Sequence, residues 1–292
     1  MNKVYVKFPK AGLGNLLLIW ARAKVFAHIN QLQIVTAPWW GFRRGAWIRN
    51  EKKKRLYNGY FKESRGIENL QIKIFGLLAT IVQDPPVKPL LQYNLKNENT
   101  LFVFHKISTS NDLYADIREY RDFVIEEIYQ LLRPLMLQRF RSYTLPVIAV
   151  HIRRGDFKIA NPITPISFFI DCINQIRNAA GDLWPVTIFT DAEEYEIEEL
   201  LQLPQVAVAE SKPDILDILL MSKSKVIVLS QSSTFSYWGA FLSDAIILKP
   251  ANDWQKNLRS ENINKQYPEI RWEENDTACV EQLNLSIKNM LA

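Results

Sequence analysis

Short apolar segments alternate with amphipathic segments along the second half of the chain. The apolar segments have the length of buried parallel strands, and the segments between them repeat apolar residues at helical spacing. This alternation predicts an α/β fold with a doubly wound parallel sheet and right-handed crossovers. The predicted strands are 147–153, 186–190, 206–208, 225–229 and 245–248, the last of them final, and the predicted helices are 166–179, 193–202, 213–222 and 234–242.

The chain opens with a predicted strand at 4–8, a turn that contains Gly12 and Gly14, and a predicted apolar helix at 16–29. A strand, a glycine-rich turn and a helix in this order are typical of nucleotide-binding folds. A complete GxGxxG fingerprint needs a third glycine, which is missing here, so a nicotinamide or flavin cofactor is disfavoured. Asn15 is expected either to offer its amide to a ligand or to cap the helix.

The remainder of the first half predicts fewer elements. A strand is expected at 101–104, followed by one amphipathic helix at 112–132 that ends before Pro134. The length of 292 residues suits two domains, which we predict as 1–140 and 141–292.

Polar residues follow the first predicted strand of the second half at once, as His151-Ile152-Arg153-Arg154-Gly155-Asp156. Ligands of open α/β sheets bind outside the carboxyl ends of the strands, so two adjacent guanidiniums there indicate an anionic ligand such as a diphosphate. Gly155 would let the backbone turn. An Arg–Asp pair that locks a loop is the alternative interpretation.

Two further strand ends carry polar side chains that could converge with this one. Asp191 is expected to accept hydrogen bonds from a base or a ribose, or else to cap the next helix. Hydroxyls and free backbone N–H groups at a helix start form an anion site, unless the serine serves only as a cap. The residues concerned are Ser230, Gln231, Ser232, Ser233, Thr234, Phe235 and Ser236.

The charge balance leaves several partners open. The chain has 36 Lys+Arg against 31 Asp+Glu, a net charge of +5, which suits nucleic acid, an anionic membrane surface or an anionic substrate. Basic residues interleave with aromatic ones over 38–65, and this mixture can stack bases, stack sugar rings or hold a protein against an anionic bilayer. A solvated basic face with tryptophans anchored in the core is the simplest interpretation.

Cysteine usage and the amino terminus indicate a reducing compartment. Cys172 and Cys279 share no CxxC-type spacing, so neither a disulfide framework nor a zinc site is predicted. No signal peptide and no bilayer-spanning apolar segment are apparent, which predicts a cytoplasmic protein, with peripheral contact to the inner face of the membrane left open.

Three segments together resemble bacterial α-1,2-fucosyltransferases. His151 to Phe157 resembles the HxRRGD(Y/F) motif of that family, Gly12 to Asn15 resembles its GLGNQ loop, and Leu229 to Leu242 is similar to its S-x-S-(S/T)-F-S-(W/Y)-W-G-A-(W/F)-L segment. The resemblance implies a GT-B fold of two facing Rossmann-like domains, with 1–140 on the acceptor side and 141–292 binding GDP-fucose. The implied reaction is an inverting, metal-independent transfer of fucose to a galactose hydroxyl of a glycan.

The resemblance also implies roles for single residues. Arg153 would neutralise the β-phosphate of the departing GDP, Arg154 would support it through Asp156, and His151 would contact the nucleotide. Asn15, with Gly12 and Gly14, would reach the fucose or phosphate, and no metal ligand is implied because the chain has no DxD. Asp191 and the segment Ser232, Ser233, Thr234, Phe235 and Ser236 complete the predicted donor site.

Two departures and two alternatives accompany this resemblance. Ala11 and Leu16 replace the usual glycine and glutamine of the first loop, which puts contacts to the acceptor or fucose there in doubt. A nucleic-acid-binding protein would use residues 39–61, although no RNA-binding signature is present. A non-catalytic module that binds a nucleotide sugar would keep the same donor site without transferring the sugar.

Overall fold

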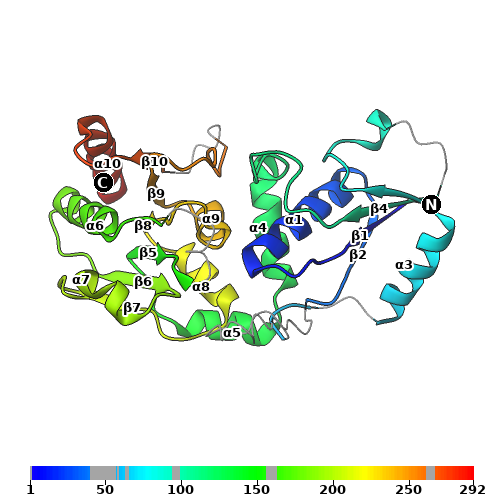
Figure 1. Ribbon diagram of the computed structural model, residues 1–292, viewed down its shortest axis with the longest axis horizontal. Helices are drawn as coiled ribbons and strands as arrows, with labels where there is room; N and C mark the ends of the chain where they lie inside the picture. Colours follow the sequence, from blue (N-terminus) through cyan, green and yellow to red (C-terminus); the bar gives the residue numbers. More distant parts are fainter. Residues whose placement is uncertain are drawn as a thin grey trace. The chain divides into compact units, whose positions relative to one another are not determined.

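The computed structural model describes residues 2–39, 57, 59–62, 66–93, 99–155, 163–260 and 267–292. The chain divides into two compact units, Met1–Gln138 and Arg139–Ala292, and each contains its own parallel sheet (Figure 1). This division and the boundary predicted after residue 140 both fall within helix α5 (Pro134–Ser142).

The first unit is built on a four-stranded sheet in the order β2-β1-β4-β3. All neighbouring strands are parallel. Strands are present at both predicted positions, although the one predicted at 4–8 runs only from residue 3 to residue 6, and the other two strands were not predicted. The strands are β1 (Lys3–Val6), β2 (Gln33–Thr36), β3 (Thr80–Gln83) and β4 (Thr100–Phe104).

Helix α1 (Leu13–Ile29) is the central helix of the first unit and is buried along most of its length. It begins three residues before the predicted start, with Gly12 as the N-cap in an extended conformation. The prediction that Asn15 caps this helix is therefore wrong, because Asn15 lies inside the first turn. Arg22, on the same helix, is fully buried and donates to Asp116 at 2.7 Å and to the carbonyl of Lys106 at 2.9 Å.

The single helix predicted at 112–132 is wrong in its first part. Asp112 accepts hydrogen bonds from the backbone N–H of Tyr114 at 3.2 Å and from the guanidinium of Arg118 at 2.8 Å, and these contacts hold the backbone in turns. Pro134 ends one helix and, with its fixed φ, begins the next. The helical elements are α3 (Gly66–Leu78), η1 (Leu90–Gln92), η2 (Arg118–Tyr120), α4 (Arg121–Leu131) and α5.

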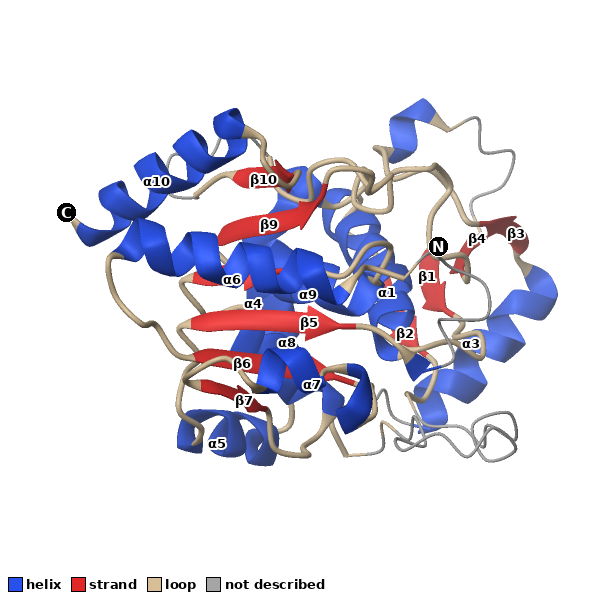
Figure 2. Ribbon diagram, turned by 60° about the vertical axis from the view of Figure 1, so that its left-hand side comes forward, coloured by secondary structure: helices blue, strands red, loops and turns tan. Residues whose placement is uncertain are grey.

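The second unit confirms the predicted doubly wound sheet. Its six strands lie in the order β10-β9-β8-β5-β6-β7, every neighbouring pair is parallel, and in Figure 2 the labelled arrows of β5, β6, β7 and β9 point to one edge. The chain builds outward from β5 in one direction and then returns to β8 on its other side. The strands are β5 (Ile148–Ile152), β6 (Val186–Thr190), β7 (Val206–Val208), β8 (Val226–Val228), β9 (Ile246–Pro250) and β10 (Glu269–Trp272).

Helices pack in neighbouring pairs on this sheet. Helix α6 lies beside α10, and α8 lies beside α9 (Figure 1). The prediction that the strand at 245–248 is final is wrong, because β10 and α10 follow it. The helix predicted at 193–202 is split in two. The helical elements are α6 (Ile166–Ala180), η4 (Glu194–Glu196), α7 (Glu198–Leu201), α8 (Asp214–Met221), α9 (Thr234–Phe241) and α10 (Thr277–Leu291).

The α8–α9 pair is closely packed around Gly239. A Cβ added at this glycine would lie 2.9 Å from the Cβ of Met221, so no larger residue fits without a shift. None of the helices in the described part of the chain is both long and apolar enough to cross a bilayer.

Candidate functional site

The candidate site of the second unit lies where β5 and β8 are neighbours. Strand order reverses between these two strands, and such a switch point opens a crevice at the carboxyl ends of the strands. The loops that follow them are bonded to each other: the backbone N–H of Arg153 donates to Ser230 Oγ at 2.9 Å, and that hydroxyl donates to the carbonyl of His151 at 2.8 Å. The sequence-predicted segments around 153 and 230 are therefore brought together.

Arg153 is held by Asp191, which follows β6. One Nη of its guanidinium forms an ion pair with the Asp191 carboxylate, and the two side chains remain 28% and 29% exposed, so a ligand can reach both. The other Asp191 oxygen accepts the backbone N–H of Arg154 at 2.7 Å. A single carboxylate thus fixes both the direction of the Arg153 side chain and the backbone beside it.

The expectation that Asp191 caps the next helix is wrong. The short helix η4 is capped by Glu193 in a capping box with Glu196, and the N–H of Ala192 donates to Thr190 Oγ1 at 2.9 Å. The Asp191 carboxylate therefore accepts from the guanidinium of Arg153 and the backbone N–H of Arg154. The sequence interpretation in which an Arg–Asp pair locks a loop is correct in kind, but the partner of Arg153 comes from another strand.

Gly155 is required by its surroundings. Its φ of +37° is one that L side chains rarely adopt, and a Cβ at this position would lie 2.5 Å from Asp191 Oδ2. The predicted backbone turn is confirmed. Glycine is required there for two reasons, the positive φ and the close approach of the Asp191 carboxylate.

Arg154 is buried, with 5% of its surface exposed. Its guanidinium donates to the carbonyl of Thr164 at 2.9 Å and to the carbonyl of Arg153 at 3.1 Å. Burial lowers the pKa of Arg154, and the nearby charges of Glu196 and Asp191 oppose this shift. Arg154 therefore organises the loop. Its predicted partner, Asp156, lies outside the described residues.

Thr164 was not identified from the sequence, although it joins the two loops. Its hydroxyl accepts the backbone N–H of Gln231 at 2.9 Å, while its carbonyl accepts Arg154. An isolated threonine before a helix gives no signal of such a role.

His151 lies near the end of β5 and is 4% exposed. Its ring packs on Phe235 of α9, with centroids 5.4 Å apart and planes inclined by 32°. This contact ties the β5 end to the start of α9, and the predicted contact of His151 with a nucleotide stays a prediction.

The segment from Ser232 to Ser236 forms the turn into α9, with Ser233 as N-cap and Thr234 as the first helical residue. Ser232 has a φ of 57°, and its side-chain oxygen accepts the indole N–H of Trp254 at 2.6 Å. Ser233 is 3% exposed, and Ser236, at 0%, donates its hydroxyl to the carbonyl of Ser233 at 3.1 Å. The half-buried Ser232 and Thr234 are thus the more accessible hydroxyls of the turn.

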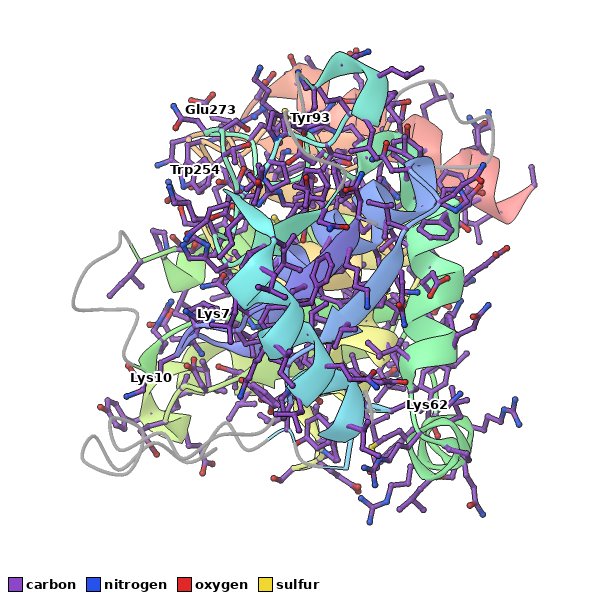
Figure 3. The ribbon with its side chains drawn as sticks, turned by 90° about the vertical axis from the view of Figure 1, so that its right-hand side faces the viewer. Lys7, Lys10, Lys62, Tyr93, Trp254 and Glu273 are labelled. Atoms are coloured by element: carbon purple, nitrogen blue, oxygen red, sulfur yellow. The ribbon has the colours of Figure 1, made fainter. Side chains whose placement is uncertain are left out.

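Trp254 was not predicted as a site residue, since it follows the strand at 245–248 that was predicted to be the final one. It lies at the outer edge of the side chains drawn in Figure 3 and is 51% exposed. Its bond to Ser232 makes it part of the same site.

The predicted residues of the first unit lie at the start of α1. A Cβ added at Gly12 would meet no atom within 4 Å, and neither Gly12 nor Gly14 adopts a positive φ. These glycines are therefore not required by the backbone conformation. Their lack of a side chain would instead allow a ligand to approach the backbone closely. That these residues and Asn15 join the second-unit site stays a prediction.

The basic aromatic segment is described only in part. Trp39, Tyr57 and Phe61 are each 1% exposed, and Trp39 packs between Phe8 and Phe61 with centroid distances of 4.4 and 4.2 Å. These aromatic rings anchor the segment in the core, as the simplest interpretation predicted, so they cannot stack bases. The rest of the segment lies outside the described residues.

Over the described ranges, His, Cys, Asp and Glu side chains form no group of three or more that could hold a metal ion.

Comparison with known proteins shows the family and the fold. The family model described as glycosyl transferase family 11 matches residues 97–272, more than half of the chain, and this match includes both loops of the second-unit site. A search of curated protein sequences gave no match.

Solved structures of low sequence identity share the fold. Fucosyltransferase NodZ from Bradyrhizobium is 12% identical over 84% of this chain and 94% of that chain, with a TM-score of 0.50. NodZ alpha-1,6-fucosyltransferase co-crystallised with GDP is 13% identical over 84% and 93%, also at 0.50. A mutant of Arabidopsis thaliana FUT1 in complex with GDP is 13% identical over 92% and 73%, with a TM-score of 0.50. The predicted GT-B fold class, with two parallel-sheet α/β units, is confirmed. Together with the family match, these observations show that the chain belongs to glycosyl transferase family 11.

Proposed function

We propose that this protein is an inverting, metal-independent α-1,2-fucosyltransferase that transfers fucose from GDP-fucose to a galactose hydroxyl of a glycan. The observation that carries the proposal is the accessible guanidinium of Arg153, which Asp191 holds at the β5–β8 switch point, while the Arg153 backbone is bonded to Ser230 just before the turn that begins α9. Membership of glycosyl transferase family 11 supports a sugar transfer. The names of the similar solved structures, NodZ and FUT1 with GDP, support a guanine nucleotide as donor.

Arg153 is the proposed catalytic residue. In the reaction an acceptor hydroxyl oxygen attacks C1 of fucose from the face opposite the phosphate. The bond between C1 and the β-phosphate oxygen breaks, GDP keeps the electron pair, and the acceptor loses its proton to water. Negative charge grows on the β-phosphate as this bond breaks, and a guanidinium that is already oriented stabilises that charge without reorganising.

Asp191 and the α9 turn would support Arg153. The Asp191 carboxylate holds one side of the guanidinium, so the charge presented to phosphate is directional. Backbone N–H groups at the start of α9, with the hydroxyls of Ser232 and Thr234, would bind phosphate oxygens from the other side. Positive side chains and backbone dipoles would thus do the work that a metal ion does where a DxD motif is present.

The linkage and the acceptor are the finer parts of the proposal. They depend on the similarity of residues 151–157 and 229–242 to α-1,2-fucosyltransferase motifs, and both segments lie within the matched region of the family.

The test is release of GDP from GDP-fucose in the presence of galactose-terminated oligosaccharides, with EDTA throughout. Wild-type protein is expected to release GDP only with an acceptor, and NMR of the product should show an α-1,2 linkage. Arg153→Ala should reduce turnover at least a hundredfold, since loss of one oxyanion-stabilising group costs roughly 10²- to 10³-fold.

Arg141→Ala is the matched control, because Arg141 is an exposed arginine of α5 and lies outside the site. It should keep wild-type turnover. Loss of activity in EDTA with recovery in Mg²⁺ would contradict the metal-independent mechanism. Absence of both GDP binding and turnover on every acceptor would exclude the transferase.

A further inference from the structure

Trp254 differs from the other tryptophans that the structure describes. Trp20, Trp39, Trp184, Trp238 and Trp272 are at most 7% exposed, whereas Trp254 is 51% exposed. Exposing a large apolar indole to water is unfavourable, because its apolar surface is then not removed from water. A single exposed apolar side chain is common on a protein surface, so the significance of Trp254 lies in its exposure together with its bond to Ser232 of the candidate site.

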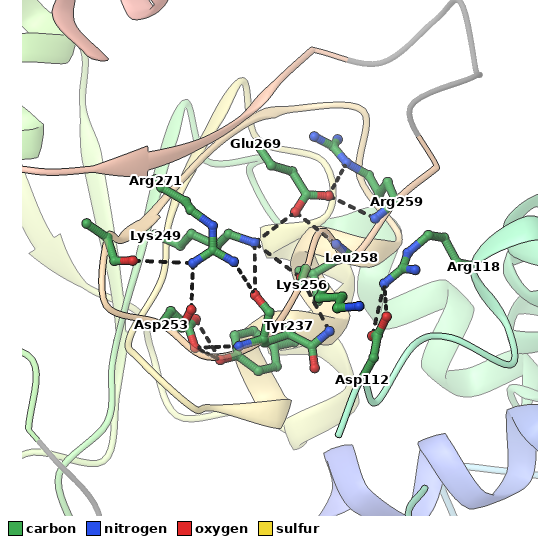
Figure 4. Close-up of polar contacts among 12 residues, drawn as sticks. Asp112, Arg118, Tyr237, Lys249, Asp253, Lys256, Leu258, Arg259, Glu269 and Arg271 are labelled. Atoms are coloured by element: carbon green, nitrogen blue, oxygen red, sulfur yellow. Dashed lines mark hydrogen bonds and ion pairs between the residues drawn. The ribbon is translucent and has the colours of Figure 1, made fainter. Parts of the chain in front are cut away.

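The residues on both sides of Trp254 are buried and held by hydrogen bonds. Its neighbours Asp253 and Gln255 are 2% and 0% exposed. Arg271 of β10 donates to the carbonyl of Asp253 at 2.6 Å and to the carbonyl of Gln255 at 2.9 Å (Figure 4). One guanidinium therefore hydrogen-bonds the backbone on both sides of Trp254. The hydroxyl of Tyr237 donates to the Asp253 carboxylate at 2.7 Å.

A buried charge network fixes the rest of this loop. Lys249 is 0% exposed and contacts Glu269 at 3.3 Å, and its ammonium also donates to the carbonyl of Lys256 at 3.2 Å. Glu269 in turn accepts the backbone N–H groups of Leu258 and Arg259 at 2.9 and 2.8 Å (Figure 4). Side chains from β9 and β10 thus hold the loop that carries Trp254 in one conformation.

The indole N–H ties Trp254 to the turn before α9. It donates to Ser232 Oγ at 2.6 Å, and this bond sets the orientation of the ring beside the turn. In the sheet, Trp254 follows β9 and Ser232 follows β8, whereas Asp191 follows β6 on the far side of β5. Trp254 and Asp191 therefore flank the candidate phosphate site on opposite sides.

We infer that the indole face of Trp254 is a stacking platform for a sugar ring next to the phosphate-binding turn. This inference rests on the proposed function. Sugars present apolar C–H faces that pack on aromatic rings, and the transferred sugar is bonded directly to the terminal phosphate. A ring one hydrogen bond away from the turn is therefore close to the reacting sugar. The same chemistry fits the donor's fucose and the acceptor's galactose, and binding experiments separate the two.

The experiment measures calorimetric affinities for GDP and for GDP-fucose, and the KM for a galactose-terminated acceptor, in wild type, Trp254→Ala and Trp254→Phe. If the ring stacks on fucose, Trp254→Ala should weaken GDP-fucose binding roughly 3- to 10-fold and leave GDP binding unchanged, which corresponds to one aromatic contact. If it stacks on the acceptor, the acceptor KM should rise by a similar factor. Trp254→Phe keeps an aromatic ring, so its affinity for GDP-fucose and its acceptor KM should stay close to the wild-type values.

Leu285→Ala is the control, because Leu285 is an exposed apolar residue of α10 at 60%. It should change none of the three values. Equal weakening of GDP and GDP-fucose by Trp254→Ala would mean that the ring contacts the nucleotide and would overturn the inference, as would three unchanged values. Wild-type protein that binds neither GDP nor GDP-fucose would remove the proposed function as well.

Discussion

Gly155 faces the carboxylate of Asp191 so closely that a single methyl group does not fit between them. The distance from an added Cβ to Asp191 Oδ2 would be 2.5 Å, and the same carboxylate holds both Arg153 and the backbone of Arg154. The size of residue 155 therefore controls the position of the arginine that we propose as catalytic.

Gly155→Ala should reduce GDP binding and turnover at least tenfold. The added methyl group must displace Asp191, which releases the guanidinium of Arg153. Calorimetry with GDP and the GDP-release assay measure this effect. Gly181→Ala is the matched control, since Gly181 also has a positive φ of +64° but no atom within 4 Å of an added Cβ. Each variant should lose about 1 kcal/mol of stability from the backbone, and only the first should lose GDP binding. Normal GDP binding by Gly155→Ala would contradict the role given to Asp191.

Arg153→Lys should lower kcat at least tenfold although the charge is kept. A guanidinium can bond Asp191 and a phosphate through separate N–H groups, whereas an ammonium is a point charge without that fixed fork. Steady-state kinetics with saturating acceptor measure the change, and Arg141→Lys on α5 serves as the control. Wild-type kcat in Arg153→Lys would mean that charge alone suffices.

Lys249 should make stability rise with pH in alkaline solution. Burial lowers the pKa of Lys249 from its usual 10.5, and the positive charge of Arg271 lowers it further. The negative charges of Glu269 and Asp253 oppose this lowering. Between the lowered pKa and 10.5 the unfolded chain binds more protons than the folded one, so the free energy of unfolding contributed by this group increases with pH. Urea unfolding at several pH values measures the slope.

Lys249→Met removes this titration, and the slope should become smaller than that of wild type in the same window. Lys288→Met, at an exposed position of α10, should keep the wild-type slope. Identical slopes in Lys249→Met and wild type would show that Lys249 does not titrate differently in the two states.

Gly239→Ala should destabilise the second unit by about 1–3 kcal/mol, the usual cost of overpacking. The added methyl group would meet the Cβ of Met221 at 2.9 Å, so the closely packed helices α8 and α9 would have to shift apart. Urea denaturation measures the loss. Gly66→Ala at the start of α3, where an added Cβ meets nothing within 4 Å, should change stability by less than about 1 kcal/mol.

Much of the second unit was predictable because its central strands are short, apolar and largely buried. The segments at 148–152 and 186–190 have this pattern, and their ends carry the polar residues that meet at the switch point. Strand β3 is largely exposed, so its residues follow no burial pattern. The partner of Arg153 could not be read from the sequence, because Asp191 lies 38 residues away and only the pairing of β5 with β6 brings it near. Trp254 is positioned by residues of β10, a strand that the sequence analysis did not anticipate.

The bracing of the Trp254 loop has a consequence for the order in which the protein matures on the ribosome. Ser232 and the start of α9 are synthesised before the loop, but the loop is fixed by Glu269 and Arg271 of the last strand. A nascent chain that has not yet reached residue 271 lacks the guanidinium that donates to the backbone carbonyls on both sides of Trp254. The turn into α9 thus precedes Trp254 in the chain, whereas the loop that carries Trp254 gains its contacts to Glu269 and Arg271 only when β10 joins the sheet.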